Sequence, residues 1–78
     1  MMKQFSIMIR SFADVQEFVA LSSKQPFAIT AGEEQEINCK SLMAVLGLNF
    51  RYPLQINADC DDAQFSDFCA AAARFITT

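Results

Sequence analysis

The sequence of 78 residues contains no histidine, and this absence narrows its chemistry more than any other feature. Histidine is the commonest general base and the commonest zinc ligand, and without it no phosphohistidine can form. The chain also has only two glycines, so it lacks a glycine-rich loop that could shape a pocket around a phosphate. Because no nucleophile is paired with a base either, we expect a protein that is not an enzyme and uses no cofactor.

Positive charge is sparse as well. Six Lys and Arg stand against nine Asp and Glu, which gives a net charge of −3. The basic residues are scattered along the chain, whereas nucleic-acid binding needs them grouped to neutralise phosphates. No apolar run approaches the roughly 18 residues of a membrane-spanning helix. We therefore expect neither nucleic acid nor a membrane as a partner.

The three cysteines, Cys39, Cys60 and Cys69, are odd in number and lack the CxxC spacing of a metal knuckle. The sequence therefore predicts no metal site and no disulfide framework. Unpaired thiols and an amino end without a signal-peptide core are typical of a cytoplasmic protein. Cys39, beside the start of a short helix, is either a reactive thiol or, as the favoured alternative, a buried and inert one.

Hydrophobic periodicity predicts a single domain over residues 1–78 with the element order βαββαβα. Alternation of apolar and polar residues indicates four strands, which are expected over residues 4–9, 27–31, 35–38 and 53–59. Residues 32–34 are expected to form the hairpin turn between the second and third strands. Helical spacing predicts long helices over residues 12–24 and 62–76. A short helix is expected to begin after Ser41, with Asn49 as its left-handed stop.

Capping residues indicate where the long helices begin. Ser11, with Asp14 three residues later, is one possible start of the first helix, and Asp14 with Glu17 is the alternative. Asp61 with Gln64 resembles a capping box for the last helix. Each pair would satisfy backbone N–H groups that the first turn of a helix leaves without partners.

The elements of this pattern predict an α+β open-faced sandwich, in which two long helices cover one face of a four-stranded sheet. The acidic return strand over residues 35–38 suits a sheet edge that must resist further pairing. The side chains expected in the core are Phe5, Ile7, Phe18, Ile29, Leu46, Ile56, Phe65 and Phe68.

Several strings in this order resemble the histidine-containing phosphocarrier (HPr) family of the bacterial sugar phosphotransferase system. The stretch Cys39–Leu48 is similar to the family's lysine, serine, two apolar residues and a short helix that ends in leucine. Gln16–Val19 resembles the first helix of the family and Leu54–Asp59 its last strand. The resemblance extends from about residue 5 to 76. It implies an antiparallel sheet in the strand order 1-4-2-3, with the helices on one face.

The start of the first helix departs from the family pattern. The family carries its phosphate there on a histidine, which is followed two residues later by an arginine and then a proline. Ser11 stands near the histidine position, and Ala13 and Asp14 stand near the other two. A phosphoserine is a stable ester, whereas phosphohistidine passes its phosphoryl group on. We therefore expect Ser11 to be a plain helix cap and the chain to be no working phosphocarrier.

Ser41 matches a serine that is a regulatory phosphorylation site in many Gram-positive members of the family. A phosphate there would meet free N–H groups at the helix start, with Lys40 beside it, but the alternative is that Ser41 merely caps the helix. A catabolite-repression paralogue in the family keeps this serine, lacks the histidine and serves a transcription regulator. The resemblance thus implies a regulatory member, with phosphotransferase-system components or a transcription regulator as its partner.

Partner proteins of this family dock on the surface around the short helix. Met43 lies off the apolar stripe of that helix and is adaptable enough for a contact surface. The residues expected to bind a partner are Lys40, Met43, Gly47, Asn49, Arg10 and Phe12. A second hypothesis is a small-ligand-binding regulatory domain of the ferredoxin-like type, which shares the βαββαβ beginning. A short second helix and a long helix after the last strand favour the first hypothesis.

Overall fold

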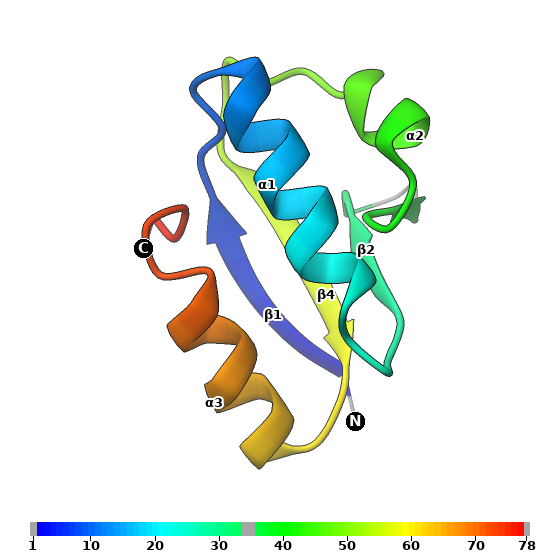
Figure 1. Cartoon of the computed structure of the whole chain (residues 1–78), viewed down its shortest axis with the longest axis vertical. Coiled ribbons are helices and arrows are strands. Elements are labelled where there is room, and N and C mark those ends of the chain that lie inside the picture. Colours follow the sequence, from blue (N-terminus) through cyan, green and yellow to red (C-terminus); the bar gives the residue numbers. More distant parts are fainter. Residues whose placement is uncertain (1, 34–35, 78) are drawn as a thin grey trace.

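The predicted order βαββαβα is present in the computed structural model, which describes residues 2–33 and 36–77 (Figure 1). The elements are β1 (Met2–Ile7), α1 (Phe12–Ser23), β2 (Ile29–Ala31), β3 (Ile37–Asn38), α2 (Leu42–Leu46), β4 (Leu54–Asp59) and α3 (Asp62–Ala71). The strands form one antiparallel sheet in the order β1-β4-β2-β3. Both the α+β class and the 1-4-2-3 order are therefore confirmed.

The register of the sheet is set around Ile56, in the interior strand β4. Ile56 lies opposite Phe5 of β1 on one side and opposite Ala31 of β2 on the other. All three residues are buried. A slip by one residue would turn this apolar row to the other face, so burial of one face specifies the pairing.

The strand β3 forms the far edge of the sheet and is only two residues long. It pairs with β2 through Thr30 and Asn38. The hairpin turn begins at Gly32, whose φ of 107° is a conformation that favours glycine. The remainder of the predicted turn and return strand includes Glu34 and Gln35, which lie outside the described residues.

The core lies between the sheet and the two long helices, α1 and α3, which cover the same face (Figure 1). Phe68 of α3 is fully buried at its centre. Its ring centroid lies 5.8 Å from that of Phe5, 6.0 Å from that of Phe27 and 6.1 Å from that of Phe18. One aromatic side chain of α3 thus contacts β1, the segment before β2, and α1.

The opposite face of the sheet is polar, as the alternation predicts. Asn57 in β4 is only 8% exposed, and its side chain is held by hydrogen bonds on this face. Its amide nitrogen donates to the Gly32 carbonyl (3.0 Å) and the Thr30 hydroxyl (3.4 Å), while its oxygen accepts from Gln55 (3.0 Å). These bonds compensate for the burial of a polar side chain.

The helix α3 ends at Ala71, earlier than the expected residue 76. The chain then turns, and Phe75 returns to the core, where it is 3% exposed. The N–H of Met8 donates to the Phe75 carbonyl (2.8 Å), and the N–H of Thr77 donates to the Ser6 carbonyl (2.9 Å). The last residues therefore pair with the outer edge of β1, so the apolar pattern at Phe75 reflects strand-like packing and not a continued helix.

Two expectations for the short helix are wrong. Leu46 is not a core residue, because α2 is only five residues long and buries Val45 alone, leaving Leu46 39% exposed. Asn49 is not a left-handed stop, since no non-glycine residue in the described ranges has a positive φ. The helix ends instead at Leu46 with Gly47 as its C-cap, and the Asn49 side-chain oxygen accepts a hydrogen bond from the N–H of Arg51 (3.0 Å). Of the other expected core residues, six are buried and one, Phe65, is only partly buried.

Candidate functional site

The start of α1 is capped by Ser11, as the first of the two sequence alternatives predicted. The Ser11 hydroxyl oxygen accepts a hydrogen bond from the N–H of Asp14 (3.2 Å). The Asp14 carboxylate in turn accepts from the N–H of Arg10 (3.0 Å). That bond, together with the Arg74 guanidinium, holds the pKa of Asp14 below its ordinary value. The Ser11 side chain therefore serves the helix start, and a carboxylate lies one turn further on.

The negative charges of the first turns of α1 are paired with Arg74. Its guanidinium contacts the carboxylate of Asp14 (3.1 Å) and that of Glu17. The same guanidinium lies over the ring of Phe75, 4.1 Å from the centroid. The turn after α3 is thus tied to α1, and the two acids of α1 are compensated by a residue distant in sequence.

The start of α2 is capped by Ser41, whose hydroxyl oxygen accepts from the N–H of Ala44 (3.3 Å). The side chain of the neighbouring Lys40 contacts a different segment. Its ammonium group donates to the carbonyl oxygen of Gln25 (2.8 Å), just after α1. Ser41 therefore caps α2, and the hydrogen bond of Lys40 links the segment before α2 to the end of α1.

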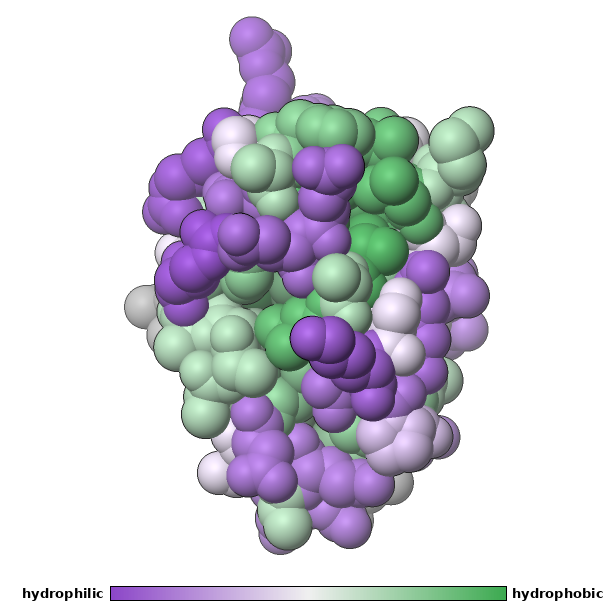
Figure 2. All heavy atoms as spheres, in the orientation of Figure 1, coloured by the Kyte–Doolittle hydropathy of each residue, from purple (hydrophilic) through white to green (hydrophobic). Residues whose placement is uncertain are grey.

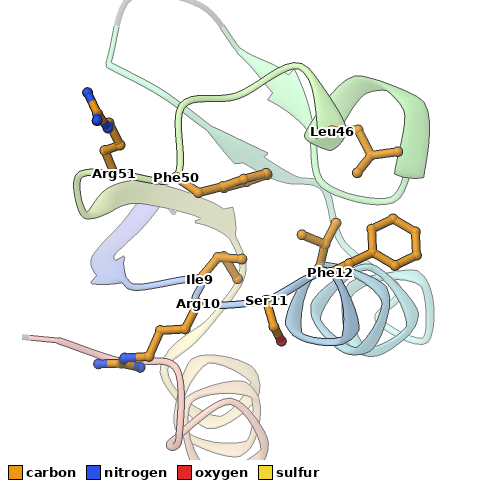
Figure 3. Close-up of a pocket in the computed structure, with 8 residues that line it drawn as sticks. Ile9, Arg10, Ser11, Phe12, Leu46, Phe50 and Arg51 are labelled. Carbon is orange, nitrogen blue, oxygen red and sulfur yellow. The ribbon is translucent and has the colours of Figure 1, made fainter.

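A cavity of about 460 Å³ lies between the start of α1 and the loop that follows α2. Its lining is mainly apolar and comprises Ile9, Phe12, Val15, Leu46 and Phe50. Arg10, Ser11 and Arg51 complete it. Figure 3 shows these side chains, which come from the link between β1 and α1, from the first turns of α1, from α2 and from the loop between α2 and β4.

The cavity brings together only some of the residues expected to bind a partner. Arg10 and Phe12 line it, but the remaining expected residues, Lys40, Met43, Gly47 and Asn49, do not. Arg51 belongs to the lining and was not predicted. The signal for it was weak, because a single arginine in a loop carries no periodicity.

Exposed apolar side chains gather in the same region. Phe12 is 56% exposed, and it lines the cavity together with Leu46, which is 39% exposed. Met43, on the same helix as Leu46, is 81% exposed, and Tyr52, in the loop after α2, is 66% exposed. Figure 2 shows apolar atoms over α2, at the upper right, with polar atoms beside them. The exposure of Met43 agrees with its predicted place on the outer side of the short helix, whereas Tyr52 was not singled out from the sequence.

The thiol of Cys39 is buried, as the favoured alternative predicted. It is 1% exposed, and burial raises its pKa to about 12. A thiol with so high a pKa stays protonated at neutral pH and is a poor nucleophile. Cys39 therefore contributes packing to the core and no chemistry to the surface around α2.

Other kinds of site are not evident in the part of the chain that the structure describes. Within residues 2–33 and 36–77, no group of three or more Cys, Asp or Glu side chains is placed to hold a metal ion. None of the helices found there is long and apolar enough to cross a membrane.

Comparison with known proteins gives no relative: the chain matches no protein-family model, no curated protein and no solved structure. The fold and the surface around α2 are therefore the physical basis for a functional proposal. The resemblance to the phosphocarrier family stays a prediction from the sequence.

Proposed function

We propose that the protein is a regulatory protein-binding module of the phosphocarrier type that does not itself carry phosphate. The observation that carries this proposal is the gathering of exposed apolar side chains around α2 and the start of α1. Among the described residues, three of the exposed large hydrophobic side chains, Phe12, Met43 and Leu46, lie on α2 or at the start of α1. Contiguous exposed apolar surface on a small protein is a common mark of a contact with another molecule.

The charges beside this surface indicate the chemistry of the partner. Arg10 and Arg51 are both exposed, and neither guanidinium forms an ion pair within the described ranges. They stand in a chain whose net charge is −3. A partner surface with apolar side chains and nearby carboxylates is complementary to this arrangement.

The surroundings of Ser11 support the absence of carrier activity. Its hydroxyl oxygen accepts a hydrogen bond from the N–H of Asp14, and the Asp14 carboxylate accepts one from the N–H of Arg10. A phosphoryl group arriving at Ser11 would meet this carboxylate in the first turn of the helix. The negative charges of the phosphoryl group and of the Asp14 carboxylate would repel each other. In addition, the serine ester that would form lacks the transfer potential of a phosphoramidate.

The lengths of the helices favour the phosphocarrier class over a ferredoxin-like ligand-binding domain. The helix α2 has five residues, and α3, with ten residues, follows the last strand. A short second helix and a helix after the last strand both favour the phosphocarrier order over the ferredoxin-like one.

Docking is tested with a pair of matched variants, Met43→Gln and Met2→Gln. Both methionines are exposed, but Met43 is on α2 while Met2 begins β1 at the other end of the molecule (Figure 1). Purified phosphotransferase-system components and the associated transcription regulators are titrated against each variant by biolayer interferometry. We expect Met43→Gln to weaken binding about fivefold or more and Met2→Gln to leave it unchanged. Equal affinity of both variants and the wild type would contradict docking through α2.

Carrier activity is tested separately with phosphoenolpyruvate and the first enzyme of the sugar system. We expect no acid-labile phosphate on this chain, and transferable phosphate recovered on it would overturn the non-carrier assignment. Incubation with a bacterial HPr kinase and ATP, followed by intact mass, tests Ser41. A mass gain that Ser41→Ala abolishes would support its regulatory role; without one, Ser41 is an ordinary helix cap.

A further inference from the structure

We propose that residues Arg74–Thr77 form a latch, which opens locally and sets the position of the docking surface at the start of α1. The latch holds the link between β1 and α1, which carries Arg10 and leads into Phe12. When the latch opens, the sheet and the helices stay folded, but the start of α1 loses its support. The latch deepens the proposed function, on which it rests for the use of that surface, and it is tested on the isolated protein.

The first hold of the latch is a pair of backbone hydrogen bonds to the outer edge of β1. The N–H of Met8 donates to the Phe75 carbonyl oxygen (2.8 Å), and the N–H of Thr77 donates to the Ser6 carbonyl oxygen (2.9 Å). Figure 1 shows the chain after α3 turning back beside the end of β1. The latch therefore fixes the backbone at the point where β1 passes into the link.

The second hold is the Arg74 guanidinium, which reaches the first turns of α1. It contacts the carboxylates of Asp14 (3.1 Å) and Glu17. The other oxygen of the Asp14 carboxylate accepts a hydrogen bond from the N–H of Arg10 (3.0 Å). A chain of polar contacts thus runs from the latch through Asp14 to Arg10, in addition to the bond at Met8. The latch holds the link near both of its ends.

The attachment of the latch is weak enough for it to open while the rest of the fold stays intact. Its ion pairs are exposed, because the Arg74 side chain is 53% exposed and that of Glu17 60%, and such pairs contribute little. Phe75 is the one buried residue of the four, and its ring packs against that of Phe18 with centroids 5.7 Å apart. Detachment exposes this one side chain, whereas unfolding of the sheet also breaks the pairing of β1 with β4.

Local opening is tested by native-state amide hydrogen exchange of the wild-type protein, followed by NMR. Ile56 lies in the interior strand β4, so its amide exchanges only when the sheet unfolds. The Met8 amide is released when the latch alone opens. After correction for intrinsic rates, we expect Met8 to exchange at least about tenfold faster than Ile56. Equal exchange rates of the two amides would overturn the proposal.

Two matched variants then show which contacts the opening breaks. Arg74→Gln removes the ion pairs of the latch, and Lys3→Gln removes the ion pair with Asp62 at the start of α3. A lost contact lowers the free energy only of those openings that break it. The Met8 exchange rate should therefore rise about threefold to tenfold in Arg74→Gln and stay unchanged in Lys3→Gln. An equal rate of Met8 in both variants would refute the latch.

A second matched pair tests whether the latch positions the docking surface. Thr77→Pro removes the N–H that donates to the Ser6 carbonyl oxygen, whereas Thr77→Ala keeps it. We expect Thr77→Pro to raise the Met8 exchange rate about fivefold and to shift the amide resonances of Arg10 and Phe12. Thr77→Ala should leave all three amides close to their wild-type values. Unshifted Arg10 and Phe12 resonances in Thr77→Pro would overturn the proposal.

The latch and the proposed function fail separately. Met43→Gln changes α2 and none of the bonds of the latch, so it should weaken docking and leave the Met8 exchange rate unchanged. If the exchange results hold but Met43→Gln leaves partner binding intact, the latch stands and docking through α2 is refuted. If Met43→Gln weakens docking but Met8 exchanges no faster than Ile56, the proposed function stands and the latch is refuted.

Discussion

Truncation of Phe68 to alanine should remove a large share of the free energy of unfolding. The side chain is fully buried, and its ring packs against those of Phe5, Phe18 and Phe27 with centroids about 6 Å apart. These neighbours come from β1, from α1 and from the segment before β2, so they cannot all move into the space that a missing ring leaves. For such a site the loss is about 3–5 kcal/mol, because the transfer free energy and the unfilled cavity both contribute.

This loss is large against the whole stability of a domain of 78 residues, which at about 0.05–0.15 kcal/mol per residue is about 4–12 kcal/mol. With a urea m-value of about 1 kcal/mol/M, the midpoint of unfolding should fall by about 3 M or more. The measurement is urea unfolding followed by far-ultraviolet circular dichroism. Because the loss expected for Phe68→Ala is comparable to the lower end of the total free energy of unfolding, Phe68→Leu provides a milder variant. Its urea midpoint should lie between those of Phe68→Ala and the wild type.

Phe12→Ala is the matched control, since Phe12 is 56% exposed and precedes the buried stripe of α1. Its removal should change the free energy of unfolding by no more than about 0.5 kcal/mol. A shift for Phe68→Ala as small as that for Phe12→Ala would refute the placement of Phe68 at the centre of the core.

Three further predictions concern titratable and buried polar groups. The pKa of Asp14 is lower in the folded than in the unfolded chain, so its stabilising contribution is present above the unfolded pKa of about 4 and is lost as the pH falls through the folded pKa. Thermal melts in acid should therefore decline less steeply for Asp14→Asn than for wild type, and equal slopes would contradict this linkage. Iodoacetamide should modify native Cys69, which is partly exposed, before the buried Cys39, and peptide masses that show Cys39 modified first would argue against the buried thiol. Ser22→Ala should raise the free energy of unfolding by about 1 kcal/mol in urea melts, because the buried Ser22 hydroxyl has no hydrogen-bond partner in the described ranges; a loss of stability would show that the hydroxyl is satisfied.

Local patterns in the sequence were sufficient to predict most of the elements. The stripe Val15, Phe18, Val19 and Ser22 is the set that α1 buries, because a helix repeats its faces every 3.6 residues whatever surrounds it. The capping box of Asp61 and Gln64 forms as predicted, since both of its hydrogen bonds join residues in the same turn. Strand order was implied by the resemblance and not by the local pattern.

Features that depend on contacts between distant segments were decided only by the tertiary structure. Phe75 has the spacing of a continued helix, yet its segment pairs with β1, since the outer edge of that strand offers backbone partners that no local pattern reveals. Leu46 has the spacing of a core residue but faces a cavity, because α2 is too short to bury both it and Val45. The cavity itself joins residues about 40 positions apart, among them Arg10 and Arg51. Periodicity determines which face of an element is apolar, whereas the packing of whole elements determines which parts of that face are covered.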